Sequence, residues 1–250
     1  FNPVVQDLSG FDWRQLPTSL EDLSLQVVDI SLLSFSSKEP LSTGLTSLKI
    51  CTRTDTTLKG YIDWNTLFPN LQILRLIVRT GSSYLMPRLL PRGLTELCAV
   101  VDRIRWVYKI DGVQSWPPHL TKLDLQVEIV PELFFLCLPP SLVSLRTRAE
   151  LSAELWKKMS LPLLQSVCIR NNEFSCLPRT LTSLETFVRT RRESFPALVS
   201  NLPPYLTHFT FHYSDIFSAD DLAMLPKSIT SLGRCNYFEP GALSTLPRIL

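Results

Sequence analysis

The chain has 250 residues, of which 45% are hydrophobic and 10% aromatic, so it is long enough and apolar enough to bury a continuous core. A formal net charge of +2 gives no bulk electrostatic reason to expect nucleic acid or a membrane surface as the partner. No apolar run has the length of a membrane span, because the richest, 129–138, is interrupted by Pro131 and Glu132.

A short leucine-rich motif recurs along the whole chain. Copies of Leu-Pro-x-x-Leu-x-x-Leu-x-Leu, or close variants of it, begin at Leu16, Leu41, Leu67, Leu90, Trp116, Leu138, Leu161, Leu177, Leu202 and Leu225. Residues 246–250 open a further copy. The second leucine position of the motif, called the anchor here, advances from Leu20 to Leu250 in steps of 17 to 26 residues with a mean of 23. Such a period is typical of proteins built from stacked, similar units.

Each copy predicts one short strand with a buried face. Leu23 and Leu25 lie two residues apart and therefore share one face of a strand, whereas Ser24 and Gln26 point to the other face. Proline suits the turn before the strand, because it needs no backbone donor there and fixes an extended approach. By the same register, Leu123 and Leu145 are expected to be fully buried in consecutive repeats.

The segments between the strands differ in length and composition. Residues 31–40, with serine, lysine and proline, predict a loop, and residues 131–136 predict a helix with Pro131 in its first turn. The short step from Leu164 to Leu181 leaves no room for a helix. We expect a tight turn and a local change of curvature there.

Two later segments carry clearer helix signals. Residues 152–159 and 218–224 each start with serine and predict a short helix. In the second segment, Ser218 and Asp221 have the spacing of a capping box, in which each side chain accepts a hydrogen bond from the other residue's backbone.

A period in the twenties with a Leu-x-x-Leu-x-Leu core resembles the leucine-rich-repeat superfamily over essentially the whole chain. The Leu-Pro opening is most similar to the irregular LP-rich repeats of protists, and more distantly to the repeats of bacterial effector ubiquitin ligases. The resemblance implies an α/β solenoid of about ten repeats, curved into a horseshoe, with a parallel β-sheet on the concave face and loops or short helices on the convex face.

The sequence departs from the effector repeats in two respects, the first being that those repeats are short and regular whereas the anchor steps here vary from 17 to 26 residues. Those repeats keep an asparagine eight residues after the anchor, and only Asn172 matches that position in this chain. The backbone groups that such asparagines satisfy must therefore find other partners. No linker or change of composition divides residues 1–250, so we expect a single domain, either a fragment or the ordered core of a longer protein.

Cysteine usage predicts a reducing compartment. The six cysteines are scattered through the repeats and form no Cys-x-x-Cys pair, and the chain has no Asn-x-Ser/Thr site. The residues after Phe1 lack the basic leader and long apolar stretch of a signal peptide. We expect free thiols and a cytoplasmic location, with a nucleus or a host cytosol as alternatives.

The signals for catalysis or metal binding are weak. His208 and His212 lie four residues apart, but on a strand this places them roughly 13 Å apart, too far for one zinc ion. Cys235 follows His212 by one repeat, and a cysteine beside a histidine can be an activated nucleophile, yet no oxyanion hole or orienting group accompanies the pair. We predict no enzyme activity, no cofactor, no metal and no small-molecule ligand.

The strand positions that face solvent provide a candidate binding site. Basic residues of neighbouring repeats form one cluster, and apolar residues that should face water form another; arginine beside aromatic residues is typical of interface hot spots. The arginines could instead be solvated or paired with Glu150 and Glu185, and following loops could cover the apolar residues. The candidate partner-binding residues are Arg75, Ile77, Val100, Asp124, Arg146, Arg148, Arg170, Glu185, Phe187 and His212.

These features favour a non-enzymatic scaffold that binds a protein partner, of unknown identity, through the concave face. One alternative is a structural subunit of a larger assembly. A second is the substrate-recognition domain of a ubiquitin ligase whose catalytic or adaptor part lies outside this chain. We do not expect nucleic acid as the partner, because no aromatic stacking platform accompanies the arginines.

Overall fold

The structure, a computed structural model, describes residues 4–5, 16–27, 44–52, 62–83, 87–104, 115–126, 130, 132–170, 174–190, 195–213, 218–233 and 239. They form two compact units. Unit 1 consists of Phe1–Leu142 and Thr147–Ala149, and unit 2 consists of Val143–Arg146 and Glu150–Leu250. Several sequence-based expectations fall on residues outside the described ranges, namely the loop 31–40, Asn172, Cys235 and the final partial repeat.

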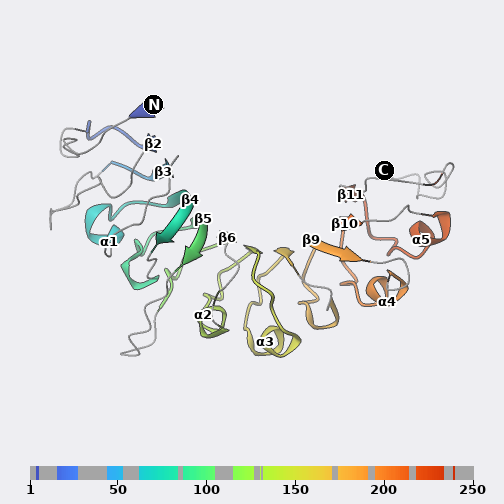
Figure 1. Cartoon of the computed structure of the whole chain (residues 1–250). Helices are drawn as coiled ribbons and strands as arrows, with labels where there is room; N and C mark the ends of the chain where they lie inside the picture. The colour runs from blue at the N-terminus through green and yellow to red at the C-terminus, as the bar shows by residue number, and fades with distance from the viewer. Residues whose placement is uncertain are drawn as a thin grey trace. The chain divides into compact units, whose positions relative to one another are not determined.

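Unit 1 is a stack of parallel strands with short helical segments on one side of them (Figure 1). The strands are β1 (Val4–Val5), β2 (Asp22–Val27), β3 (Ser47–Thr52), β4 (Ile73–Ser83), β5 (Glu96–Ile104) and β6 (Lys122–Gln126), each paired with the next. The return segments contain α1 (Trp64–Leu67), the 3-10 turn η3 (Pro87–Leu89) and α2 (Glu132–Leu136). Strand β1 precedes the first repeat and was not predicted.

Unit 2 repeats the same arrangement. Its strands are β7 (Ser144–Thr147, of which the last residue is grouped with unit 1), β8 (Ser166–Ile169), β9 (Ser183–Thr190), β10 (His208–Tyr213) and β11 (Ser231–Gly233), paired in this order. The return segments hold α3 (Ala153–Lys158), η4 (Phe174–Cys176), α4 (Phe195–Val199) and α5 (Ala219–Ala223). Strands β2 to β11 each follow one anchor, which confirms ten repeats. Across the described ranges, no helix is long and apolar enough to span a membrane.

A β-turn converts each Leu-Pro-x-x-Leu motif into the entrance of a strand. The anchor N–H donates to the carbonyl of the residue three positions earlier, as from Leu94 to Pro91 at 3.1 Å and from Leu206 to Pro203 at 3.2 Å. Proline at this first turn position keeps its carbonyl as the acceptor and loses no donor that the turn needs. The same bond occurs at Leu20, Leu71, Leu120, Leu142, Leu164, Leu181 and Ile229.

Glycine immediately before an anchor shows how closely consecutive turns approach. A Cβ added to Gly44 would clash with the carbonyl oxygen of Thr18 in the preceding turn, whereas a Cβ added to Gly93 would meet nothing within 4 Å. Both glycines occupy the same motif position. Substituting alanine at the two glycines therefore distinguishes the effect of packing on stability from the effect of backbone entropy.

We expect Gly44→Ala to lower the free energy of unfolding by about 1–3 kcal/mol, because the turn carbonyl of Thr18 must move. Gly93→Ala is the matched control and should raise it by about 0.4–1 kcal/mol, since alanine restricts the unfolded chain. Urea denaturation of both variants measures the two free energies of unfolding. Equal effects at the two positions would show that Gly44 is not a close-approach site.

The core consists of the leucines that the repeat pattern assigned to it. Leu123 and Leu145 are 1% and 0% exposed, which confirms the predicted register. Towards the C-terminus, aromatic residues replace leucine in the core-facing positions. Phe209 and Phe211 on β10 stack at 4.6 Å, and Phe195 of α4 stacks on Phe211 at 5.9 Å. The wider rings fill the space between strand and helix in this part of unit 2.

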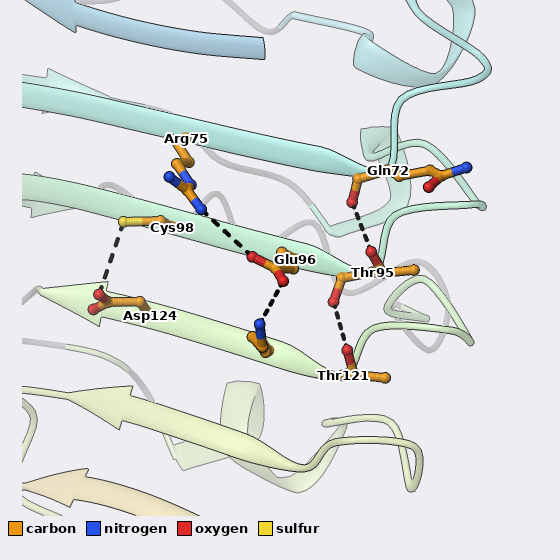
Figure 2. Close-up of polar contacts among 8 residues, drawn as sticks. Gln72, Arg75, Thr95, Glu96, Cys98, Thr121 and Asp124 are labelled. Carbon is orange, nitrogen blue, oxygen red and sulfur yellow. Dashed lines mark hydrogen bonds and ion pairs between the residues drawn. The ribbon is translucent and has the colours of Figure 1, made fainter. Parts of the chain in front are cut away.

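Threonines directly after the anchors link consecutive repeats. The Oγ1 of Thr95 donates to the carbonyl of Gln72 at 3.1 Å, and that of Thr121 to the carbonyl of Thr95 at 3.1 Å (Figure 2). The same bond recurs at Thr46, Thr182, Thr207 and Thr230. This row lies at the strand entrance and not eight residues after the anchor, so it adds a ladder of its own and does not replace the missing asparagines.

The predicted helices form with the expected caps. Ser152 caps α3 through the N–H of Leu155, and Ser218 and Asp221 form the capping box of α5. Between Leu164 and Leu181, the described residues after strand β8 form the 3-10 turn η4 and no α-helix, in accord with the short spacing of these two anchors. Helices α1 and α4 were not predicted.

Candidate functional site

Three rows of side chains lie on the face of unit 1 that is opposite the core, called the open face here. The strand pairing confirms the register read from the sequence. From β2 to β6, the first row is Asp22, Ser47, Ile73, Glu96 and Lys122; the middle row is Ser24, Lys49, Arg75, Cys98 and Asp124; and the third row is Gln26, Cys51, Ile77, Val100 and Gln126.

One carboxylate serves two cations on this face. Glu96 on β5 lies 2.6 Å from the ammonium of Lys122 and 3.7 Å from the guanidinium of Arg75, and Figure 2 shows its ion pair with Arg75. Lys49 lies beside Arg75 in the register and has no carboxylate within 4.0 Å among the described residues. Positive charge is therefore in excess over β3 and β4.

The other end of the middle row carries a carboxylate. Asp124 on β6 accepts a weak hydrogen bond from the thiol of Cys98 at 3.8 Å (Figure 2). Ile77 and Val100 pair directly in the third row, and both are half-buried. The middle row of the open face thus carries the cations Lys49 and Arg75 and, at its other end, the carboxylate of Asp124. The apolar pair Ile77 and Val100 lies in the third row.

In unit 2, an ion pair crosses one strand to reach the next. Arg146 on β7 and Glu185 on β9 lie on either side of Cys168 in the register, and their charged groups are 2.7 Å apart. Cys168 occupies a solvent-facing row but is only 5% exposed. Because the ion pair bridges the strand that carries Cys168, we expect it to cover this thiol. Pairing with Glu185, one of the alternatives left open, is therefore confirmed for Arg146.

The cover over Cys168 can be tested by its reactivity. In the native protein, we expect a thiol reagent to modify Cys168 more slowly than the half-buried Cys51 and Cys98. Arg146→Ala removes one half of the cover and should raise the Cys168 rate several-fold, with the other two thiols unchanged. Mass spectrometry of modified peptides over time gives each rate. An unaltered Cys168 rate would rule out the ion pair as its cover.

Two predicted strand residues lie beyond the strand ends, which corrects the predicted third row in this region. Arg148 follows the end of β7 at Thr147, and Arg170 follows the end of β8 at Ile169. The hydroxyl of buried Thr147 accepts a hydrogen bond from the N–H of Ala149 at 3.1 Å, which turns the chain out of the strand direction. Both arginines are exposed.

A register shift separates two of the candidate residues, Phe187 and His212, which lie on neighbouring strands. Phe211 pairs with Thr186, but Tyr213 pairs with Thr190, so the two strands are out of step between these pairs. Phe187 is half-buried on β9. His212 lies on β10, but its side chain is outside the described part. The strand assignment itself confirms that His208 and His212 are not on a helix.

Sequence reasoning overlooked the first row of the open face. Glu96 and Lys122 lie two residues before Cys98 and Asp124, so the same two-residue alternation that gave the middle row would have found them. The five described cysteines, Cys51, Cys98, Cys137, Cys168 and Cys176, are free thiols. Within the described ranges, no three His, Cys, Asp or Glu side chains are arranged to hold a metal ion.

Comparisons with known proteins give structural likeness only. No protein-family model matches the chain, and no curated protein sequence matches it. Internalin InlF from Listeria monocytogenes is 15% identical with a TM-score of 0.52, over 98% of this chain and 70% of that one.

Two further solved structures are more distant. CroV588, a circular leucine-rich-repeat protein, is 18% identical with a TM-score of 0.45, over 90% of this chain and 38% of that one. The leucine-rich-repeat protein LegL7 from Legionella pneumophila is 12% identical with a TM-score of 0.30, over 93% and 63%. The chain thus spans less than two thirds of either protein. The repeated motif, the parallel strands after each anchor and the likeness to the internalin together show that this chain has the leucine-rich-repeat fold.

Proposed function

We propose that the chain is a non-enzymatic scaffold that binds a partner protein through the open face of its strands, the face that the sequence predicts as concave. The observation that supports this most is the arrangement of unit 1, where cations and the Ile77–Val100 pair occupy neighbouring rows on the side away from the helices (Figure 1). Charged groups beside an apolar centre are the composition of protein interfaces. The leucine-rich-repeat fold is also typically non-enzymatic.

The ten candidate residues divide by their surroundings. Arg75, Ile77, Val100 and Asp124 lie on strands of unit 1, and Arg148 follows β7. Arg170, Phe187 and His212 belong to unit 2 and remain candidates, while Arg146 and Glu185 would contribute as an already neutralised pair. The free thiols of the described cysteines support a cytoplasmic location as part of this proposal.

A second candidate, the structural subunit, has an observation of its own. Large apolar side chains are exposed away from the open face, on helices and turns. Leu133 on α2 is 58% exposed, Leu163 in a turn 54%, and Tyr205 in another turn 69%. A permanent neighbour covering these residues would contact helices and strand-entrance turns, and not the strand face of the first proposal.

Affinity purification from the native source, with quantified recovery, tests the proposal. Arg148→Glu with Arg170→Glu should reduce recovery of the bound protein by more than about tenfold, because attraction becomes repulsion. The matched control is Arg92→Glu with Arg179→Glu, two exposed turn arginines with the same change of charge. Lys157 is less suitable as a control, because it is hydrogen-bonded to the Glu154 carboxylate at 2.8 Å and lowers the pKa of that carboxyl.

Each outcome has a distinct meaning. Loss of the bound protein in the Arg148 and Arg170 variant alone supports the proposal, because these arginines directly follow strands β7 and β8, and loss in the turn variant alone contradicts it. A stoichiometric partner that is insensitive to the Arg148 and Arg170 variant and is lost on Tyr205→Ser would favour the structural subunit. Recovery of ubiquitin-transfer proteins would favour the recognition domain of a ligase.

A further inference from the structure

Lys49 on β3 and Arg75 on β4 place two positive charges side by side on neighbouring strands. Lys49 and Arg75 are direct neighbours in the parallel register, about 4.8 Å apart along the sheet. Like charges opposite each other on neighbouring strands are destabilising. Of the described carboxylates, only Glu96 lies within 4.0 Å of either cation, and it is closer to Lys122 at 2.6 Å than to Arg75 at 3.7 Å. An external anion over Lys49 and Arg75 would relieve this repulsion.

The charges that face this position come from known strands. Across the middle row, neutral Cys98 separates Arg75 from the carboxylate of Asp124, which is paired with the thiol of Cys98 at 3.8 Å. Asp124 therefore lies two strands from Arg75 and three from Lys49. The row has a positive end and a negative end, and an acidic group on a partner is attracted to the positive one.

An uncharged strip lies next to the cationic pair. Two residues further along the same strands, Cys51, Ile77 and Val100 are consecutive in the register and all half-buried. Two residues of strand span about 6.6 Å, and three neighbouring strands span about 10 Å. The strip is therefore wide enough for one aliphatic side chain. It lies two residues along the strands from the cations.

An extended peptide has the same two-residue spacing on one of its sides. A carboxylate placed over Lys49 and Arg75 would put the side chain two residues away over Ile77 and Val100. Because both charged groups are side chains on a solvent-facing row, no rearrangement of the core is needed. Arg75 has 50% of its side chain exposed.

We propose that the open face over β3, β4 and β5 binds an extended segment of a partner protein that carries a carboxylate and, two residues from it, an aliphatic side chain. This inference rests on the proposed function and specifies the chemistry of the partner. Lys49 and Arg75 hold the carboxylate, and the strip of Cys51, Ile77 and Val100 covers the aliphatic group.

Selection from a display library of random dodecapeptides against the intact chain tests this inference. We expect enriched peptides to carry Asp or Glu two residues from Ile, Leu, Val or Met. Lys49→Glu with Arg75→Glu should weaken binding of a synthesised winner by more than about tenfold. Replacing the peptide's acid with lysine should restore binding to that variant. Arg92→Glu with Arg179→Glu is the control and should bind like the wild type.

Three results would overturn the inference. In the first, no selected peptide depends on Lys49 and Arg75 for binding. In the second, the acidic and aliphatic residues of the selected peptides have helical spacing. In the third, the peptide with lysine in place of its acid does not bind the Lys49→Glu, Arg75→Glu variant. Circular dichroism of the double variant confirms that it is folded before binding is compared. If native partners still depend on Arg148 and Arg170 while the peptide results fail, the proposed function stands and only this inference falls.

Discussion

Phe211→Ala is expected to lower the free energy of unfolding of unit 2 by about 3–5 kcal/mol, the range for removing a buried aromatic side chain. Phe211 is 1% exposed and stacks on both Phe209 and Phe195, so its loss leaves a cavity and also removes two ring contacts. Guanidinium unfolding, monitored by circular dichroism, measures the change.

The half-buried Phe187, on the neighbouring strand, is the control. Phe187→Ala should cost clearly less, because part of its ring already contacts solvent. A loss below about 1 kcal/mol for Phe211→Ala would contradict the assignment of β10's aromatic residues to the core.

Leu123→Ala and Leu145→Ala should each lower the free energy of unfolding by about 2–5 kcal/mol through the cavity that each leaves. Each repeat packs mainly on its neighbours, so the loss can unfold a block of repeats before the rest. Leu133→Ala serves as the comparison, because its side chain is 58% exposed and should change stability by less than about 0.5 kcal/mol. If Leu123→Ala also changed the free energy of unfolding by less than about 0.5 kcal/mol, the strand register would be wrong.

The sequence predicted the strands and their register because one physical signal was repeated. Leu23 and Leu25, and their equivalents, alternate with polar residues, and a strand permits only one way to bury them. The capped helices α3 and α5 were predictable for a similar reason, since Ser152 and Ser218 mark their starts. Helix α1 also begins after an N-cap, Asp63, whose carboxylate accepts a hydrogen bond from the N–H of Thr66 at 3.0 Å, and the sequence analysis missed this signal.

The candidate site was less predictable, because it depends on distances between repeats. The pairing of Arg146 with Glu185 requires a side chain small enough for the bridge to pass over, and Cys168 provides it. The ends of β7 and β8 depend on the hydroxyl of Thr147 and on the short repeats that follow. The threonine row was visible as a recurring residue after the anchor, but its hydrogen bonds needed the register of neighbouring repeats.

The central claim is that the partner binds the open face, and site-specific photo-crosslinking tests it most directly. A photoreactive residue would replace Lys122 on β6, whose side chain is 60% exposed on the open face, or Leu133 on α2, which is 58% exposed on the helix side. Both positions are exposed and lie in the same unit. We predict that Lys122 crosslinks to the partner in native extract and Leu133 does not; crosslinks from Leu133 alone would contradict the claim and favour a structural subunit.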